Sequence, residues 1–149
     1  MPELQLELTN DELLSTTRAV RKRLDFDRDV PMSAIKECME SAVQAPSGSN
    51  AQGWQFVFVT DKDKREKIGE YYRQAFSQYR HMPFAIHKLH ADSADESLAT
   101  SQERSASSAD YLAGNMGKAP VLMIPCIAGR IDNAEGTNAS AQAGTMGSI

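Results

Sequence analysis

The amino-acid sequence predicts a mixed α/β (α+β) fold in which a mixed sheet is flanked by helices. Apolar residues recur at helical spacing over 33–45 and over 61–79. Two compact apolar runs, 54–60 and 119–128, are instead typical of buried strands. The resulting order is helix, helix, strand, helix, an insertion and strand, and no repeat or linker divides it.

The composition is that of one soluble globular domain. The chain has 149 residues, of which 41% are hydrophobic and 24% are charged, so we expect residues 1–149 to form a single domain. The formal net charge of −4 does not favour nucleic acid or an anionic membrane as a partner, because phosphate binding depends on clustered Lys and Arg. The longest apolar stretch, Val121 to Ala128, is too short to span a bilayer.

The N-terminus and the cysteines indicate a cytoplasmic protein. Residues 1–12 are acidic and lack the apolar core of a signal peptide. Cys38 and Cys126 lie in apolar segments without metal-ligand spacing. We therefore expect two reduced, buried thiols.

Helices are predicted to dominate the first third of the chain. Residues 4–20 form the first helix. Its candidate N-cap residues are Thr9, Asn10 and Asp11. A charged stretch then ends at Pro31, whose ring disfavours helix at the preceding residue. A second helix is predicted over 33–45, followed by a loop over 46–50.

A strand and a helix follow. Residues 54–60 have apolar side chains on both faces, so we expect this strand inside the sheet rather than at its edge. Residues 61–79 are predicted to be a helix capped by Asp61. The polar segment 81–108 has weak periodicity and is interpreted as an excursion, either a mobile lid or an extra helix.

The last predicted elements are a short helix over 108–116 and a second buried strand over 119–128. Pro120 stands at the start of that strand, where a missing amide donor is tolerated. Residues 129–149 are rich in Gly, Asn, Ala and Ser.

A basic cluster follows the first predicted helix. Arg18 and Arg21 are three positions apart at its end, so they are expected to share a face. Two guanidinium groups on one face would make a phosphate clamp, because each presents a planar fork of donors. Spacing alone favours the alternative, a solvated basic helix end that the negative C-terminal dipole stabilises.

A second candidate site joins the second helix to the first strand. The small residues of segment 45–54 permit close approach of a flat ligand to the backbone, and the Asn50 and Gln52 amides both donate and accept hydrogen bonds. Such a loop suits a heteroaromatic ring. The alternative, favoured when the loop is taken alone, is an ordinary turn in which Ser and Asn cap backbone groups.

Together the two clusters resemble the nitroreductase family. Segments 17–23, 45–54 and 56–61 are similar in order and spacing to its N-terminal half. The usual motifs of the family there are Arg-Ser-x-Arg and then Ala-Pro-Ser-x-x-Asn-x-Gln-Pro-Trp. Residues 118–122 resemble the family's next core strand, and residues 147–149 resemble the opening of the following helix.

Two departures from the family wording accompany this resemblance. Ala19 stands where the family has Ser, and Gly53 stands where it has Pro. Neither change removes a charge or a large apolar anchor, so they bear on substrate preference more than on flavin binding.

The resemblance implies FMN bound non-covalently at the two-fold interface of a homodimer. Arg18 and Arg21 would hold the phosphate and the polar side of the flavin, and the loop of the partner subunit would approach the isoalloxazine ring. The implied cofactor-binding residues are Arg18, Ala19, Val20, Arg21, Pro46, Ser47, Gly48, Asn50, Gln52, Ser148 and Ile149. No catalytic side chain is implied, because the flavin carries the hydride.

The implied function is hydride transfer from NAD(P)H to nitroaromatic, quinone or related small electron-poor acceptors. The sequence has no Gly-x-Gly-x-x-Gly turn for a second nucleotide, so donor and acceptor are expected to alternate in one cleft by a ping-pong mechanism. Two alternatives stay open. One is a specialised relative such as a reductive dehalogenase or an enoyl-type reductase, and the other is a flavin-binding storage or sensing protein without turnover.

Two further expectations concern the histidines and the end of the chain. His81, His87 and His90 are interpreted as solvent-exposed rather than metal-bound, since Asp92 is the only obvious further ligand. Family members continue beyond the segment that matches 147–149 with a long buried helix. We therefore expect this chain to be a C-terminally incomplete nitroreductase domain.

Overall fold

The computed structural model describes residues 7–90 and 92–127. These residues form two compact units, the first made of 7–28 and 61–120 and the second of 29–60 and 121–127. Helices and a two-stranded sheet together give an α+β fold.

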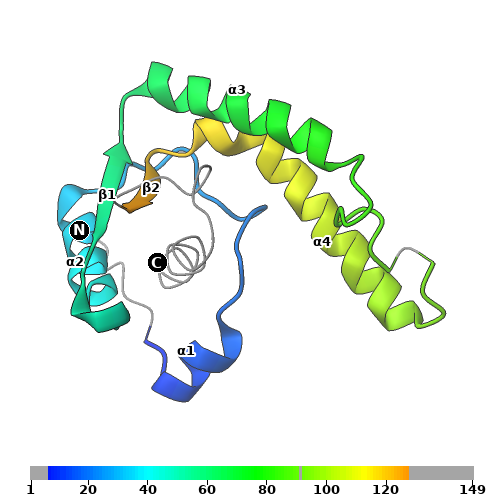
Figure 1. Ribbon diagram of the computed structural model, residues 1–149, viewed down its shortest axis with the longest axis horizontal. Coiled ribbons are helices and arrows are strands. Elements are labelled where there is room, and N and C mark those ends of the chain that lie inside the picture. Colours follow the sequence, from blue (N-terminus) through cyan, green and yellow to red (C-terminus); the bar gives the residue numbers. More distant parts are fainter. Residues whose placement is uncertain (1–6, 91, 128–149) are drawn as a thin grey trace. The chain divides into compact units, whose positions relative to one another are not determined.

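The first unit is helical. It contains α1 (Asn10–Thr16), α3 (Lys62–Tyr79), α4 (Glu96–Asn115) and the short 3₁₀ helix η2 (Met116–Lys118). Figure 1 shows α3 in green and α4 in yellow-green, with α4 leading directly into η2 beneath α3. The buried side of α4 consists of small residues, Ala106, Ala109 and Ala113, which recur at helical spacing.

The contact between α3 and η2 depends on glycine. A Cβ atom at Gly69 would lie 2.7 Å from the backbone nitrogen of Gly117, a separation that no side chain tolerates without movement. Nearby, Nη1 of Arg65 donates a hydrogen bond to the backbone oxygen of Ala119. The chain after α4 is therefore held against the first half of α3.

The second unit contains α2 (Met32–Ala42), the 3₁₀ turn η1 (Gly48–Asn50), β1 (Trp54–Val59) and β2 (Leu122–Ile127). The two strands pair antiparallel, from Trp54 opposite Ile127 to Val59 opposite Leu122, and they lie side by side in Figure 1. Strand β1 leads out of η1, so the sheet anchors the candidate loop of the second unit.

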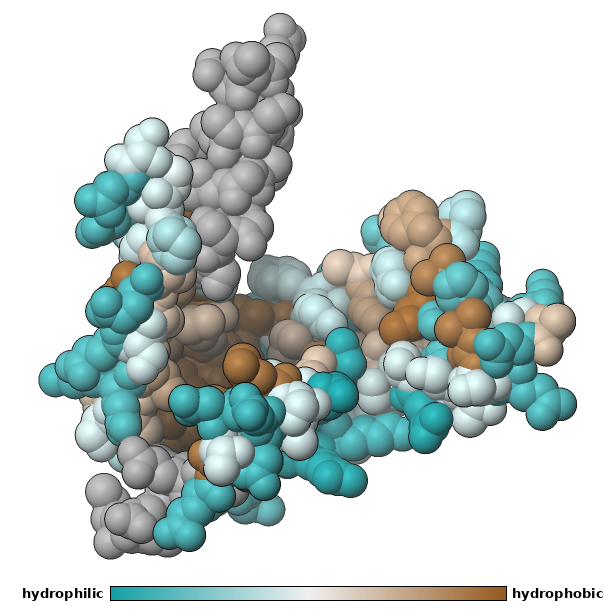
Figure 2. Space-filling model, turned by 90° about the horizontal axis from the view of Figure 1, so that it is seen from below, coloured by the Kyte–Doolittle hydropathy of each residue, from teal (hydrophilic) through white to brown (hydrophobic). Residues whose placement is uncertain are grey.

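Large apolar side chains are exposed in both units. Figure 2 shows apolar residues, in brown, at the surface among hydrophilic ones. In α1 the side chain of Leu14 is 78% exposed, and on the strands Val57 and Met123 are 49% and 50% exposed. Soluble proteins usually cover such side chains.

The first predicted helix is shorter than expected. Residues 4–6 lie outside the described residues. In the described part of the chain, α1 begins only at Asn10, because Thr9 and Glu12 form a capping box. The helix ends at Thr16, since Thr17 has ψ 125°. The prediction of helix up to residue 20 is therefore wrong.

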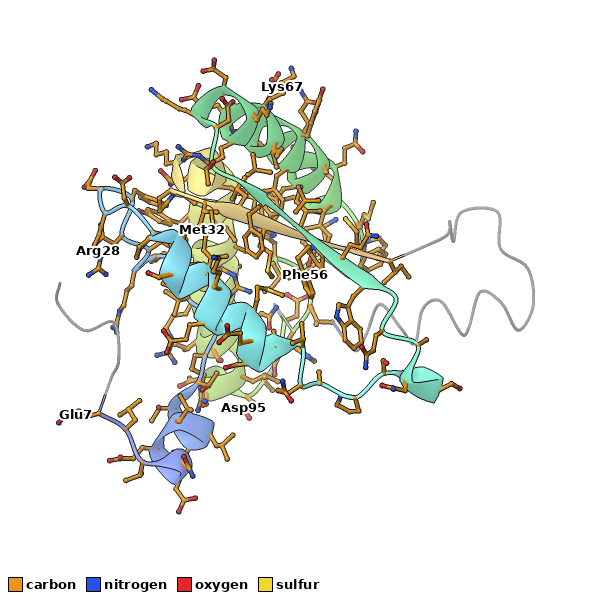
Figure 3. The ribbon with its side chains drawn as sticks, turned by 90° about the vertical axis from the view of Figure 1, so that its left-hand side faces the viewer. Glu7, Arg28, Met32, Phe56, Lys67 and Asp95 are labelled. Atoms are coloured by element: carbon orange, nitrogen blue, oxygen red, sulfur yellow. The ribbon has the colours of Figure 1, made fainter. Side chains whose placement is uncertain are left out.

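The prediction of an interior strand over 54–60 is not met by the described residues. Strand β1 pairs there with β2 alone, and Phe56, at the middle of β1 in Figure 3, stands opposite Pro125. The second strand begins at Leu122 rather than at residue 119.

Within the segment 81–116 the extra-helix alternative is confirmed, but the separate short helix predicted over 108–116 is wrong because one helix continues through it. Helix α4 spans the 20 residues Glu96–Asn115. Its N-cap is Asp95, labelled in Figure 3, whose Oδ1 accepts hydrogen bonds from the backbone N–H groups of Ser97 and Leu98 at 2.9 and 3.2 Å. The apolar periodicity was weak because alanines, not large residues, form its buried face.

The thiols also differ from expectation. Both cysteines are free, but Cys38 is exposed and Cys126 is only half-buried. The exposure of Cys38 agrees with its place in α2, where Ile35 is the one buried residue.

Candidate functional site

The basic cluster, here called the arginine segment (residues 18–22), lies beyond the end of α1 rather than on a helix. Nη1 of Arg18 donates hydrogen bonds to the backbone oxygens of Ser15 and Thr17 at 3.0 and 2.7 Å. Arg21 is half-buried. The expectation that Arg18 and Arg21 share a helical face is therefore wrong, because the capping box of α1 and the extended Thr17 end the helix before them.

The backbone of the arginine segment offers unused donors. The N–H groups of Arg18, Ala19, Val20 and Arg21 make no hydrogen bond with any residue of 7–90 or 92–127. Val20 is 56% exposed. Backbone N–H groups and guanidinium groups are the two kinds of donor that bind phosphate in proteins.

The predicted loop, residues 46–53, is a turn held by its own side chains. Ser47 Oγ accepts a hydrogen bond from the Gln52 backbone at 3.0 Å, and Gln52 Nε2 donates to Asn50 Oδ1 at 2.7 Å. The backbone N–H of Asn50 donates to the Ser47 oxygen at 2.9 Å. These bonds agree in part with the ordinary-turn alternative, since Ser and Asn side chains do satisfy local groups.

The same loop has an unusual backbone. Ser49, Asn50 and Gln52 have φ angles of 52°, 54° and 46°, in the left-handed region that non-glycine residues rarely adopt. Around Gly48 there is open space where a Cβ would stand. In the described part of the chain, the N–H groups of Gly48 and Ser49 donate to no partner. The loop thus has two backbone N–H groups without a described partner, at a position where no side chain covers the backbone.

The remaining predicted residues fall into different places. Pro46 lies in the exposed entry to the loop, and Ser148 and Ile149 lie outside the described residues. The arginine segment belongs to the first unit and the loop to the second. Each cluster is defined by its own unit's geometry.

One cluster of polar residues was missed by the sequence analysis. Nε2 of His87 lies 2.9 Å from Asp110 Oδ1, and Nη1 of Arg80 lies 3.3 Å from the same oxygen. The side chain of His87 is 17% exposed, so the expectation of a solvent-exposed histidine is wrong at this position. No local spacing could have linked it to Asp110, which is 23 positions away.

An open pocket of about 520 Å³ lies beside this cluster, between the 86–87 segment and α4. Its walls include Ile86, His87, Gln102, Glu103, Ser107 and Asp110. Sequence reasoning missed this pocket because it depends on α4 being one continuous helix.

The described residues contain neither a metal-binding cluster nor a membrane-spanning helix. Among residues 7–90 and 92–127, no three His, Cys, Asp or Glu side chains gather as metal ligands would. No helix within the same residues combines the length and apolar character needed to cross a bilayer.

Comparison with known proteins finds relatives that match part of the chain. Iodotyrosine deiodinase 1 of Rattus norvegicus and that of Mus musculus are each 36% identical to this chain over 72 residues, which cover 46% of this chain and 25% of the relative. A Methanothermobacter thermautotrophicus protein provisionally named NADH dehydrogenase/NAD(P)H nitroreductase is 34% identical over 59 residues, which cover 40% of this chain and 30% of that protein.

The aligned part therefore spans less than a third of each of these relatives. A model of the nitroreductase family, in contrast, matches residues 14–147. That range includes both the arginine segment and the loop. The chain belongs to the nitroreductase family.

Proposed function

We propose that the chain is a subunit of an FMN-dependent oxidoreductase that transfers hydride from NAD(P)H to small electron-poor acceptors such as nitroaromatics and quinones. Family membership supports oxidoreductase chemistry. The name of the archaeal relative supports NAD(P)H as the donor. The observation that carries the proposal is the backbone of the loop at residues 48–52.

That loop fits a flat heteroaromatic ligand. Three non-glycine residues at positive φ each cost about 1–3 kcal/mol, a type of strain that clusters at functional sites. The unpartnered N–H groups of Gly48 and Ser49 would donate to acceptor atoms at the ring edge. The amides of Asn50 and Gln52 would add a donor and an acceptor.

The arginine segment fits a phosphate group. Arg18 and Arg21 would supply charge, while the backbone N–H groups of Ala19 and Val20 would supply neutral donors. Ala19 lacks the hydroxyl that its family usually has, but its free backbone N–H can serve the same oxygen. Charged and neutral donors together fit FMN better than a flavin without phosphate.

When bound, FMN supplies a ring that accepts a hydride and passes it on. The chain's own residues are then required to bind, to orient the reactants and to keep water away. No nucleophilic side chain is needed, and the candidate residues are accordingly donors of hydrogen bonds. His87 and Asp110 are paired with each other, so we assign them no part in hydride transfer.

The test is a titration of the purified protein with FMN. Binding is detected as quenching of flavin fluorescence and from the absorption bands of oxidised flavin. Arg18→Ala is expected to weaken FMN binding by about 1.5–3 kcal/mol, the value of one charge-assisted hydrogen bond. The double variant Arg18→Ala, Arg21→Ala should lose more. Arg73→Ala, which removes an exposed arginine of α3, serves as the control. Unchanged FMN affinity in the double variant would refute the phosphate site.

Turnover is tested by steady-state oxidation of NADH and of NADPH, with and without an acceptor. Parallel double-reciprocal lines are expected, because donor and acceptor would take turns in one cleft. Intersecting lines would argue for a ternary complex. FMN binding without any acceptor-dependent oxidation would favour the storage or sensing alternative.

A second candidate function is reductive removal of halogen from an aromatic ring. It is favoured by the similarity to iodotyrosine deiodinase 1 over 72 residues. Iodide release from an iodinated phenol, measured in parallel with nitroaromatic reduction at equal NAD(P)H, separates the two candidates. Faster iodide release would move the assignment to a dehalogenase.

A further inference from the structure

We infer that α4 is the support that positions the arginine segment for phosphate binding, through Ser107, Ser108 and Tyr111. This inference rests on the proposed function, and it gives a role to residues that the sequence analysis placed at the end of an excursion and in a short helix. Ser107 and Ser108 are positioning residues, because they would act on the phosphate through Lys22 and Arg21. Tyr111 holds the chain beyond this segment through the ring of Phe26.

Three side-chain contacts join the two parts of the first unit. Lys22 Nζ donates to Ser107 Oγ at 2.7 Å, and Arg21 Nη1 donates to Ser108 Oγ at 3.5 Å. Four residues further along the chain, the ring of Phe26 stacks on the ring of Tyr111 with centroids 6.5 Å apart and planes 25° apart.

These contacts come from one continuous surface of α4. Positions 107 and 111 are one helical turn apart and therefore share a face, and position 108 adjoins them. The arginine segment has no helix of its own to hold its side chains, since α1 ends at Thr16. A rigid helix on which it rests supplies the order that the segment lacks.

The chemistry of the contacts leaves the positive charges available. No carboxylate among the described residues pairs with Arg18, Arg21 or Lys22, whose partners are backbone oxygens and serine hydroxyls. A neutral oxygen orients a cation without neutralising it, so the charge still attracts an anion. A structural ion pair would have cancelled it.

The hydroxyl of Ser108 is itself oriented. Its one hydrogen is donated to the backbone oxygen of Ser105 at 2.8 Å. The lone pairs of Oγ are therefore left for the guanidinium of Arg21. This arrangement holds Arg21 from the side and leaves its other nitrogens without a described partner.

The test compares the dissociation constants of FMN and riboflavin, because riboflavin lacks the phosphate. In the double variant Ser107→Ala, Ser108→Ala, the FMN dissociation constant should rise roughly three- to tenfold, the value of about one hydrogen bond, while that of riboflavin stays unchanged. Ser101→Ala is the matched control, because Ser101 is exposed on the same helix and makes no described hydrogen bond. Ser107→Thr, which keeps the hydroxyl, should retain FMN affinity.

The outcomes separate this inference from the function on which it rests. If the double variant binds FMN as tightly as the unaltered protein does, the positioning role is wrong and the proposed function stands. Equal weakening of FMN and riboflavin would also overturn it, since that is the result of a general loss of structure. Failure of the unaltered protein to bind either flavin would overturn the proposed function itself.

Discussion

At the scale of single residues, the loop combines a strained backbone with a glycine that the fold does not need. The positive φ angles that cost free energy are those of Ser49, Asn50 and Gln52. The backbone at position 48 would accept a side chain. No atom lies within 4 Å of a Cβ built at Gly48 or at Gly53. Stability therefore does not explain a glycine at position 48. A ligand that approaches the backbone, as the proposed function requires, would explain it.

Gly48→Ala is accordingly predicted to leave the free energy of unfolding unchanged or to raise it by up to about 1 kcal/mol, because alanine lowers the entropy of the unfolded chain. FMN affinity should fall at the same time, since the added methyl group would stand where the ring approaches. Gly53→Ala, with equal space and outside the implied flavin contacts, is the control. A Gly48→Ala protein with unaltered FMN affinity would remove Gly48 from the site.

A second residue-scale prediction concerns the capping box of α1. The backbone N–H and the hydroxyl of Thr9 donate to the Glu12 carboxylate and lower the pKa of Glu12. A lowered pKa means that the stabilisation of α1 is present above the ordinary pKa of glutamate and is lost as the pH falls through the lowered value.

Thr9→Ala removes the hydroxyl donor but keeps the backbone N–H, which is the larger cause of the shift. It should therefore raise the pKa of Glu12 only part of the way toward its ordinary value, as followed by NMR titration of the Glu12 carboxyl carbon. Thr17→Ala is the control, because the Thr17 hydroxyl donates to the backbone oxygen of Leu13 instead. If both variants moved the Glu12 pKa equally, the capping box would not be its cause.

At the scale of elements, the close approach of α3 to η2 distinguishes two helical glycines. Gly69→Ala is expected to destabilise the fold by about 1–3 kcal/mol, as overpacking does, because the new methyl group would meet the backbone of Gly117. Gly114→Ala in α4 meets nothing within 4 Å. It should stabilise the helix by about 0.5–1 kcal/mol through propensity alone.

Chemical denaturation of both variants measures the two effects. They should have opposite signs although the substitution is the same. Neutrality of Gly69→Ala would show that α3 and η2 do not approach as closely as described. Destabilisation by Gly114→Ala would contradict the open space around that position.

At the scale of the whole molecule, exposed apolar side chains such as Leu14, Val20 and Met123 favour association. We predict a homodimer in solution, as does the resemblance, which implies a site built from two subunits. Light scattering should give twice the mass of one chain, with one FMN per chain. A monomer that binds stoichiometric FMN would contradict the prediction.

How much could be predicted from the sequence differs between elements and sites. Helix α3 with its Asp61 cap, β1 within one residue and the family were all predictable, because they depend on local capping, on alternation and on two spaced motifs. The proposed flavin-binding residues stay a prediction. The local geometry of these residues, including the positive φ angles at Ser49 and Asn50, could not be predicted from the composition of the loop.

The local sequence by itself determined where the helices α1, α3 and α4 begin, because their capping residues Thr9, Asp61 and Asp95 act within two or three positions. It also determined family membership. Only the tertiary structure decided what α4 contacts. Its alanines carry no periodic signal of large apolar residues, and its serines meet Arg21 and Lys22 across more than 80 positions. Contacts between residues so far apart in sequence form only when the chain folds back on itself, so no local sequence pattern predicts them.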